Sequence, residues 1–366
     1  MESLPRIRFP LMAVVLLAAL AAMWAGLVRL GWGLPPLTST LTMTHGPLMI
    51  SGFLGTLINL ERVVALNRRW AYAAPLATAS GVVVLLLGVT GPIGPLLMLL
   101  GSLGMAAIFV LIVRRQPALY TVTMAMGALA WLVGNGLWLA GWPIYRVVFW
   151  WIGFLVLTIA GERLEMSRVL RISRSSQMLF LGITGIFGVG LVLVSLDLDL
   201  GWRVAGLGML GLSVWLLHYD VARRTARQAG LTRFIAVSLL SGFVWLGVGG
   251  ALAIVFGKVM VGPRYDAVLH TVFLGFVFSM IFGHAPIILP AVLGLPMVFQ
   301  PVFYSHWALL HLSLLLRVIG DVAGWFPIRQ WGGMFNVIAL LLFLYNTARA
   351  VIKSRSERRA VAGASR

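Results

Sequence analysis

The most constraining feature of this sequence is a succession of apolar runs, separated by short breaks of Pro, Gly and charged residues. About 20 apolar residues are enough to cross the hydrocarbon core of a bilayer as one helix. The runs give twelve predicted spans, so the sequence predicts an all-α polytopic membrane protein. The spans are 10–31, 41–64, 72–91, 94–113, 118–141, 146–167, 176–196, 201–219, 232–256, 264–289, 302–320 and 331–351.

The composition excludes a soluble globular protein. Hydrophobic residues make up 60% of the chain and charged residues 10%, against about 45–50% and about 25% in soluble domains. We expect a single transmembrane domain over residues 1–353 and a basic cytoplasmic tail over 354–366. The first apolar run is longer than the apolar core of a signal peptide and has no clear cleavage site, so we interpret it as a span.

The distribution of basic residues predicts the orientation. With the N-terminus inside, alternate loops hold 21 of the 28 Lys and Arg residues, as the positive-inside rule requires. Both termini are therefore predicted to be cytoplasmic, in the inner membrane of a bacterial cell, although the predicted inner loop 290–301 carries no charge. The basic residues of the inner loops account for the net charge of +18. We therefore expect a lipid bilayer, and no nucleic acid, as partner. The sequence does not determine an oligomeric state.

Three spans share a short pattern that suggests an internal repeat. A real repeat at every fourth helix predicts three four-helix arcs around a pseudo-threefold axis. The alternative is coincidence, because Gly-Phe is common in membrane helices. The aligned pieces are Gly52-Phe53-Leu54 with Glu61 nine residues after the Gly, Gly153-Phe154-Leu155 with Glu162, and Gly275-Phe276-Val277 with His284.

Histidines are the candidate cofactor ligands. The chain has no Cys, which excludes disulfides, iron–sulfur clusters and Cys-ligated haem. Neutral imidazole binds haem iron or copper, and an ionisable residue inside a membrane span is a functional candidate by default. The sequence contains no P-loop, dinucleotide-binding or zinc-protease motif, so nucleotide-driven and hydrolytic chemistry have no support.

His45 and His270 form the strongest candidate pair. Each lies near the outer end of a span that is predicted to run from outside to inside. The two side chains are therefore expected at the same depth, as bis-imidazole haem ligation requires. The alternative is that each one caps a helix end or hydrogen-bonds a carbonyl.

His284 follows His270 by 14 residues, which is about 40° short of four helical turns and about 21 Å along the axis. Both rings are then expected on one face, where they could serve two stacked cofactor sites. The alternative is a structural role: Pro286 and Pro290 are expected to break the helix and release carbonyls that His284 could satisfy.

His306 and His311 lie five residues apart, which places them about 140° apart around a helix. They are therefore not expected to bind one ion together. His306 is a candidate metal ligand that could complete an inner site with His284, and His218 at the inner end of the eighth predicted span is the alternative partner. His311 lies deeper and is a candidate ligand for a second haem or for copper, the alternative being a helix–helix hydrogen bond.

Other polar residues have simpler interpretations. Glu61 and Glu162 stand beside Arg and are expected to form ion pairs at the cytoplasmic interface, although a proton entrance is a second reading. Five predicted outer cations could pair with haem propionates. They are Arg146, Arg203, Lys258, Arg264 and Arg317.

The segments "HGPLMISGFLG", "HTVFLGFVFSMIFGHAP" and "ALLHLSLLLRVIGD" resemble the NnrS family of bacterial membrane haem and copper proteins linked to nitric oxide stress. They are also distantly similar to the catalytic subunit of haem-copper oxidases. The resemblance covers about a third of the chain. It implies twelve helices in three arcs, with a low-spin haem held by His45 and His270.

The departures from the oxidase pattern matter. In those oxidases the sixth and seventh helices carry copper-ligating histidines, whereas the sixth and seventh predicted spans here have no His. The resemblance therefore implies a haem fold without the usual copper site, which argues against dioxygen reduction and proton pumping.

Two classes of function compete. The first is a haem b protein with a redox or nitric-oxide-related role, which would make it a candidate haem-dependent oxidoreductase with an electron donor or nitric oxide as partner. The second is a secondary transporter, with a central path built from Glu61, Asn59, Glu162 or Asn135. A non-catalytic factor for assembly or haem handling is a third reading.

Overall fold

The computed structural model describes residues 4–364 and the side chains of residues 7–356. This part is 83% helical and contains no strand. Eleven of its helices are long and apolar enough to cross a membrane, which confirms an all-α polytopic membrane protein. The remaining predicted span, 72–91, forms a shorter apolar helix, Trp70–Leu86. It ends early because the chain turns at Gly88, where φ is +72°.

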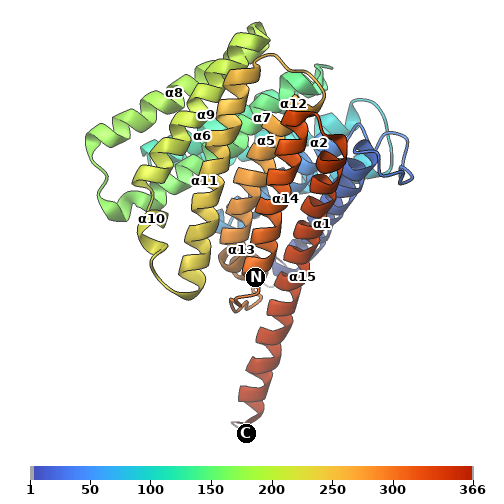
Figure 1. Ribbon diagram of the computed structural model, residues 1–366. Helices are drawn as coiled ribbons and strands as arrows, with labels where there is room; N and C mark the ends of the chain where they lie inside the picture. The colour runs from blue at the N-terminus through green and yellow to red at the C-terminus, as the bar shows by residue number, and fades with distance from the viewer. Residues whose placement is uncertain (1–3, 365–366) are drawn as a thin grey trace. The chain divides into compact units, whose positions relative to one another are not determined.

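The chain forms two compact units, Met1–Met166 with Leu181–Gly208, and Ser167–Phe180 with Met209–Arg366. Figure 1 shows the helices in chain order. The elements of the first unit are α1 (Leu4–Arg29), α2 (His45–Pro47), η1 (Leu48–Gly55), α3 (Thr56–Leu66), η2 (Trp70–Tyr72), α4 (Ala73–Leu86), α5 (Ile93–Arg115), α6 (Leu119–Leu139) and α7 (Ile144–Met166). Residues of α8 (Arg174–Leu196) and α9 (Leu198–Tyr219) belong to both units.

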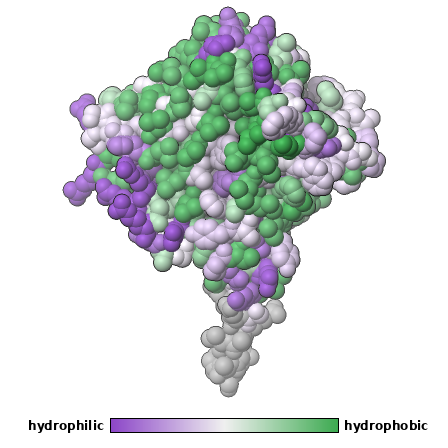
Figure 2. Space-filling model, viewed as in Figure 1, coloured by the Kyte–Doolittle hydropathy of each residue, from purple (hydrophilic) through white to green (hydrophobic). Residues whose placement is uncertain are grey.

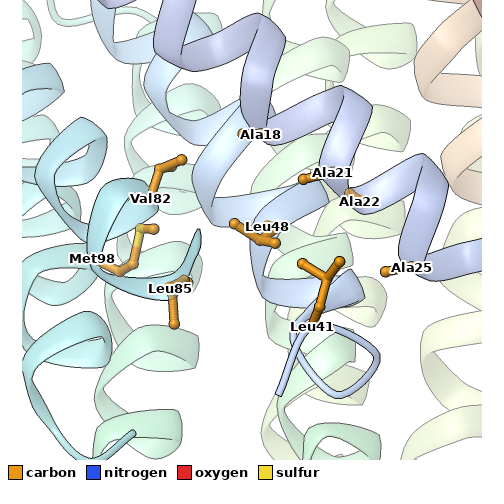
Figure 3. Packing of buried hydrophobic residues seen from close by; sticks show 9 residues of the cluster. All are labelled: Ala18, Ala21, Ala22, Ala25, Leu41, Leu48, Val82, Leu85 and Met98. Atoms are coloured by element: carbon orange, nitrogen blue, oxygen red, sulfur yellow. The ribbon is translucent and has the colours of Figure 1, made fainter. Parts of the chain in front are cut away.

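A face of small residues on α1 organises one core of the first unit (Figure 3). Ala18, Ala22 and Ala25 follow one another at helical spacing and are completely buried. Small side chains let membrane helices approach closely, and η1 and α4 pack on this face. The cluster is Ala18, Ala21, Ala22, Ala25, Leu41, Leu48, Val82, Leu85 and Met98.

In the second unit α11 packs against η4 and α13, and α14 packs against α12 and α15. α15 is one continuous helix to Ala364, so the helix extends into the predicted tail that starts at 354. The elements are η3 (Ser167–Leu170), α10 (Ala222–Thr225), α11 (Gly230–Phe256), α12 (Pro263–His270), η4 (Thr271–Phe278), α13 (Ser279–Leu293), α14 (Phe303–Ala323) and α15 (Phe326–Ala364).

The helices expose apolar side chains as a lipid-facing surface requires. Leu96, Leu100 and Leu103 lie on one face of α5 and are each about half exposed, at 44–52%. Hydrophobic residues cover much of the helical surface in Figure 2. A lipid bilayer is therefore the natural surrounding of this chain.

The second and tenth predicted spans share a feature that the sequence did not predict. Each continues from a histidine into a π-helical segment, η1 after α2 and η4 after α12. In η1, Gly55 faces the ring of Trp131 so closely that a Cβ would clash, and in η4 Gly275 faces Trp245 in the same way. The sixth span, α7, is α-helical throughout. The structural likeness therefore covers two of the three aligned spans, and the three arcs stay a prediction.

One expectation for the tenth span is wrong, and a second loses its geometric basis. Pro286 and Pro290 do not break the helix, because α13 runs through both and ends at Gly294 in a left-handed conformation. Membrane helices tolerate Pro where neighbouring groups satisfy the freed carbonyls. We expected His270 and His284 on one face because an α-helix turns 100° per residue. The whole of η4 lies between them, however. A wider π turn changes this rotation, so the helical count no longer places the two rings together.

Candidate functional site

A buried ion pair between two helices forms the centre of the candidate site in the second unit. Asp266 lies on α12 and Arg317 on α14, and their side chains are only 15% and 8% exposed. Arg317 donates from Nε to Oδ2 at 2.7 Å and from Nη2 to Oδ1 at 2.9 Å. Such a two-point contact fixes orientation as well as charge, so Asp266 is held in one position.

His270 stands one turn after Asp266 and is oriented by it. Its Nδ1 lies 2.9 Å from the Asp266 carbonyl oxygen and 3.2 Å from Oδ1. Because a carbonyl oxygen can only accept, Nδ1 carries the proton and the ring lone pair is on Nε2. Metal-ligating histidines usually donate their other nitrogen to a carboxylate or carbonyl in this manner. The local geometry therefore suits Nε2 of His270 for binding a metal.

Further charged residues extend the site toward α15. Arg329 forms an ion pair with the buried Asp321, with 2.8 Å between Nε and Oδ1, and its Nη2 lies 3.9 Å from Oδ1 of Asp266. Two carboxylates are thus matched by two guanidinium groups. The balance matters because an unpaired charge at membrane depth is costly.

Sequence reasoning named Arg317 and His270 but missed Asp266 and Arg329. The segment "PRYDAVLH" holds the signal for Asp266, because residues four apart face each other on a helix. Nothing comparable in the sequence indicates Arg329, which reaches the site only through the packing of α14 on α15.

His311 forms a helix–helix hydrogen bond. Trp245 donates its Nε1 proton to His311 Nδ1 at 2.9 Å, and His311 Nε2 lies 3.0 Å from the Ser241 hydroxyl. Trp307 donates to the same hydroxyl at 3.1 Å. Both ring nitrogens are engaged, so His311 would have to give up one of these bonds to bind a metal.

His306 is buried in an aromatic cluster, with only 1% of the residue exposed. Asn346 donates to its Nδ1 at 3.1 Å, and the ring packs against Phe282 with centroids 4.7 Å apart. Its Nε2 has no hydrogen-bond partner among the described residues. His306 and His311 therefore have separate environments, and neither belongs to the Asp266 site.

His284 hydrogen-bonds its own helix. Its Nδ1 donates to the Met280 carbonyl at 2.8 Å. The carbonyls that Pro286 and Pro290 release belong to Phe282 and Pro286. The hydrogen bond of His284 Nδ1 therefore does not satisfy a carbonyl released by a proline, which was the structural role that the sequence suggested.

His45 lies in the first unit on the small-residue face of α1. Its Nδ1 donates to the Ala22 carbonyl at 2.7 Å. Its Cε1 lies only 3.1 Å from where a Cβ on Gly26 would stand, so the ring packs directly on the α1 backbone. As with His270, the proton is on Nδ1 and the lone pair on Nε2, just before a π-helical segment.

The other polar candidates of the first unit are engaged in structural contacts. Arg62 forms an ion pair with Glu162, as the sequence predicted for these acids. Asn135 accepts hydrogen bonds from Ser51 at 2.9 Å and from Trp151 at 3.0 Å, and Asn59 donates to the Gly101 carbonyl at 3.3 Å. These bonds tie η1, α3, α5, α6 and α7 together.

Most of the predicted outer cations also have partners. Arg203 pairs with Asp199 at 2.8 Å. Arg146 lies over the ring of Trp142 and Arg264 over that of Phe256. Arg317 is bound to Asp266. Each of these arginines would have to give up its present contact to bind a haem propionate.

Comparisons with known proteins give one result. No curated protein and no solved structure matches this chain. A family described as a domain of unknown function, DUF8744, matches residues 8–352, a range that contains both units' histidines. The chain therefore belongs to the DUF8744 family.

Proposed function

We propose that this protein is an integral membrane haem protein of the NnrS-like type, in which His270 is an axial ligand of haem b. The observation that carries the proposal is the contact between His270 Nδ1 and Asp266, at 2.9 Å to the carbonyl and 3.2 Å to Oδ1. With Nδ1 directed at Asp266, Nε2 is the ring nitrogen that would bind the iron. Arg317 supports the arrangement because its two bonds hold the Asp266 carboxylate in place.

The donor set suits haem better than a metal ion held by side chains alone. Among the described residues there is no group of three or more His, Cys, Asp or Glu side chains placed to hold a metal ion. Haem iron takes four nitrogens from the porphyrin and needs only one or two axial side chains from the protein. A single well-oriented imidazole on a membrane helix is therefore sufficient, and copper remains a less favoured candidate.

His45 is the second proposed axial ligand. Its Nδ1 proton is held by the Ala22 carbonyl at 2.7 Å, so its lone pair is also on Nε2. A π-helical segment follows it, as one follows His270, and such segments are frequent at functional sites. That both histidines bind the same haem is a prediction from the sequence.

Haem b would supply a one-electron couple and an iron that binds nitric oxide. The residues described above would set the position of the imidazoles. The proposed partners are an electron donor or nitric oxide. The proposed location is the bacterial inner membrane with both termini cytoplasmic, since this orientation puts 21 of 28 basic residues inside.

Haem content in histidine variants tests the proposal. We expect His270→Ala and His45→Ala to lose most of the bound haem, because each loses an axial nitrogen. His218→Ala is the matched control, since His218 is an exposed histidine outside the proposed ligand set, and it should keep the full complement. The measurement is a pyridine haemochrome assay on purified protein, normalised to protein concentration.

The result against the proposal is a folded His270→Ala protein with full haem content and an unchanged absorption spectrum. Circular dichroism would verify that each variant is folded, so that loss of haem is not confused with loss of structure.

A further inference from the structure

A basic pocket in the second unit is lined by none of the proposed haem ligands. It has a volume of about 760 Å³ and is lined by residues 170–173, Ser176, 218–220, 223, 224 and 227. This volume is within the usual range for small-ligand sites, about 300–1,000 Å³. The pocket lies where α8 begins and α9 ends, so it is at the ends of two membrane-spanning helices.

The residues that line the pocket include four arginines and one carboxylate. The arginines are Arg171, Arg223, Arg224 and Arg227, and all four are exposed. Among the side chains of residues 7–356, no carboxylate is within ion-pairing distance of these four guanidinium groups. The carboxylate, Asp220, is buried, and its Oδ1 accepts the Ala222 backbone N–H at 2.7 Å. The pocket therefore holds a surplus of positive charge.

The backbone adds to this positive potential. The 23-residue helix α8 starts at Arg174, and Ser173, which precedes it, and Ser176 in its first turn both line the pocket. Ser173 accepts the Ser176 N–H at 3.2 Å, which marks the helix N-terminus. The unpaired N–H groups and the dipole at such an end favour anions.

Figure 2 shows hydrophilic residues gathered at the lower left, where Figure 1 draws α10. Arg223 and Arg224 lie on this short helix, and Arg227 follows it. The sequence "ARRTARQ" thus concentrates charge beside the ends of two spans. Such a place is where the phosphate of a membrane lipid, or a soluble phosphate compound, would meet the protein.

We propose that this pocket binds a phosphate-bearing anion. Guanidinium groups bind phosphate oxygens with two-point geometry, and four arginines line this pocket beside a helix N-terminus. The phosphate could belong to an anionic phospholipid or to a soluble compound. The proposal is independent of haem binding, because no proposed haem ligand lines the pocket.

Two binding experiments distinguish a lipid phosphate from a soluble phosphate compound. Full-length protein is purified and delipidated, and native mass spectrometry then measures binding of anionic phosphatidylglycerol, with zwitterionic phosphatidylcholine, whose net charge is zero, as the reference. Isothermal titration with inorganic phosphate is the second experiment. One of these two experiments should show binding to the unmodified protein and so identify the source of the phosphate. In that experiment we expect the Arg223→Gln/Arg224→Gln variant to bind the anion at least tenfold more weakly.

The matched control is Arg114→Gln/Arg115→Gln, an adjacent exposed pair in the last turn of α5. It removes the same charge outside the pocket and should change affinity less than twofold. Arg227→Gln provides a milder pocket variant if the double substitution impairs folding. An equal loss in both double variants, or no binding of either probe to the unmodified protein, overturns the proposal.

Discussion

At the residue scale, Asp266 connects the histidine to the rest of the site. It accepts from His270 on its own helix and from Arg317 on α14. A buried pair of this kind contributes little net stability when intact, but removing one partner leaves an uncompensated charge. An exposed pair is worth much less, because water screens both charges.

This contrast predicts the effect of Arg317→Leu. We expect it to lower the free energy of unfolding by about 3–5 kcal/mol, because Asp266 loses its two-point partner in a buried place. The control is Arg203→Leu, which removes the Arg203–Asp199 pair whose side chains are 44% and 48% exposed. It should lower the free energy of unfolding much less than Arg317→Leu does, because water screens an exposed pair.

Denaturant-induced unfolding in detergent micelles, followed by circular dichroism, measures both variants. Equal losses for Arg317→Leu and Arg203→Leu would show that the Asp266–Arg317 pair is not buried as described.

At the element scale, close contact between α14 and α15 brings Arg317 and Arg329 into the site. Gly320 packs against the backbone of Arg329, and Gly332 packs against that of Arg317. At Gly332 a Cβ would stand 2.6 Å from the Arg317 nitrogen. Only glycine leaves room for two backbones at this distance.

Gly332→Ala is therefore expected to destabilise the protein by about 1–3 kcal/mol, because the added methyl group forces the two helices apart. The control is Gly182→Ala on α8, where a Cβ would meet no described atom within 4 Å. There the higher helix propensity of Ala should make the change neutral or stabilising by up to about 1 kcal/mol. Thermal unfolding of both variants checks the prediction, and a Gly332→Ala protein as stable as Gly182→Ala would contradict the close approach.

Element boundaries show what periodicity can and cannot predict. Each of the twelve apolar runs falls on a helix of the described residues, and eleven of these helices are long and apolar enough to cross a membrane, because a crossing demands about 20 apolar residues whatever the packing. The π-helical segments η1 and η4 were not predicted, and the packing of their glycines on Trp131 and Trp245 involves other helices that a local pattern does not contain. The continuity of α13 through Pro286 and Pro290 likewise depends on neighbours that a local pattern does not contain.

At the scale of the whole molecule, composition determined the class of protein and the histidines suggested its chemistry. The sequence separated His45 and His270 from His306 and His311 by predicted depth alone, and it gave no reason based on their contacts. The structure supplies one, because His311 is bonded at both nitrogens and His306 is enclosed by aromatic rings. Hydrogen bonds between distant helices decide this difference, and spacing along one helix does not reveal them.

The central claim is that this membrane protein binds haem. The most direct test is a reduced-minus-oxidised absorption spectrum of the purified full-length protein, with a haemochrome assay on the same sample. The account predicts sharp haem b bands at close to one haem per chain. A colourless, folded protein that takes up no added haem would contradict it and would favour a secondary transporter or an assembly factor instead.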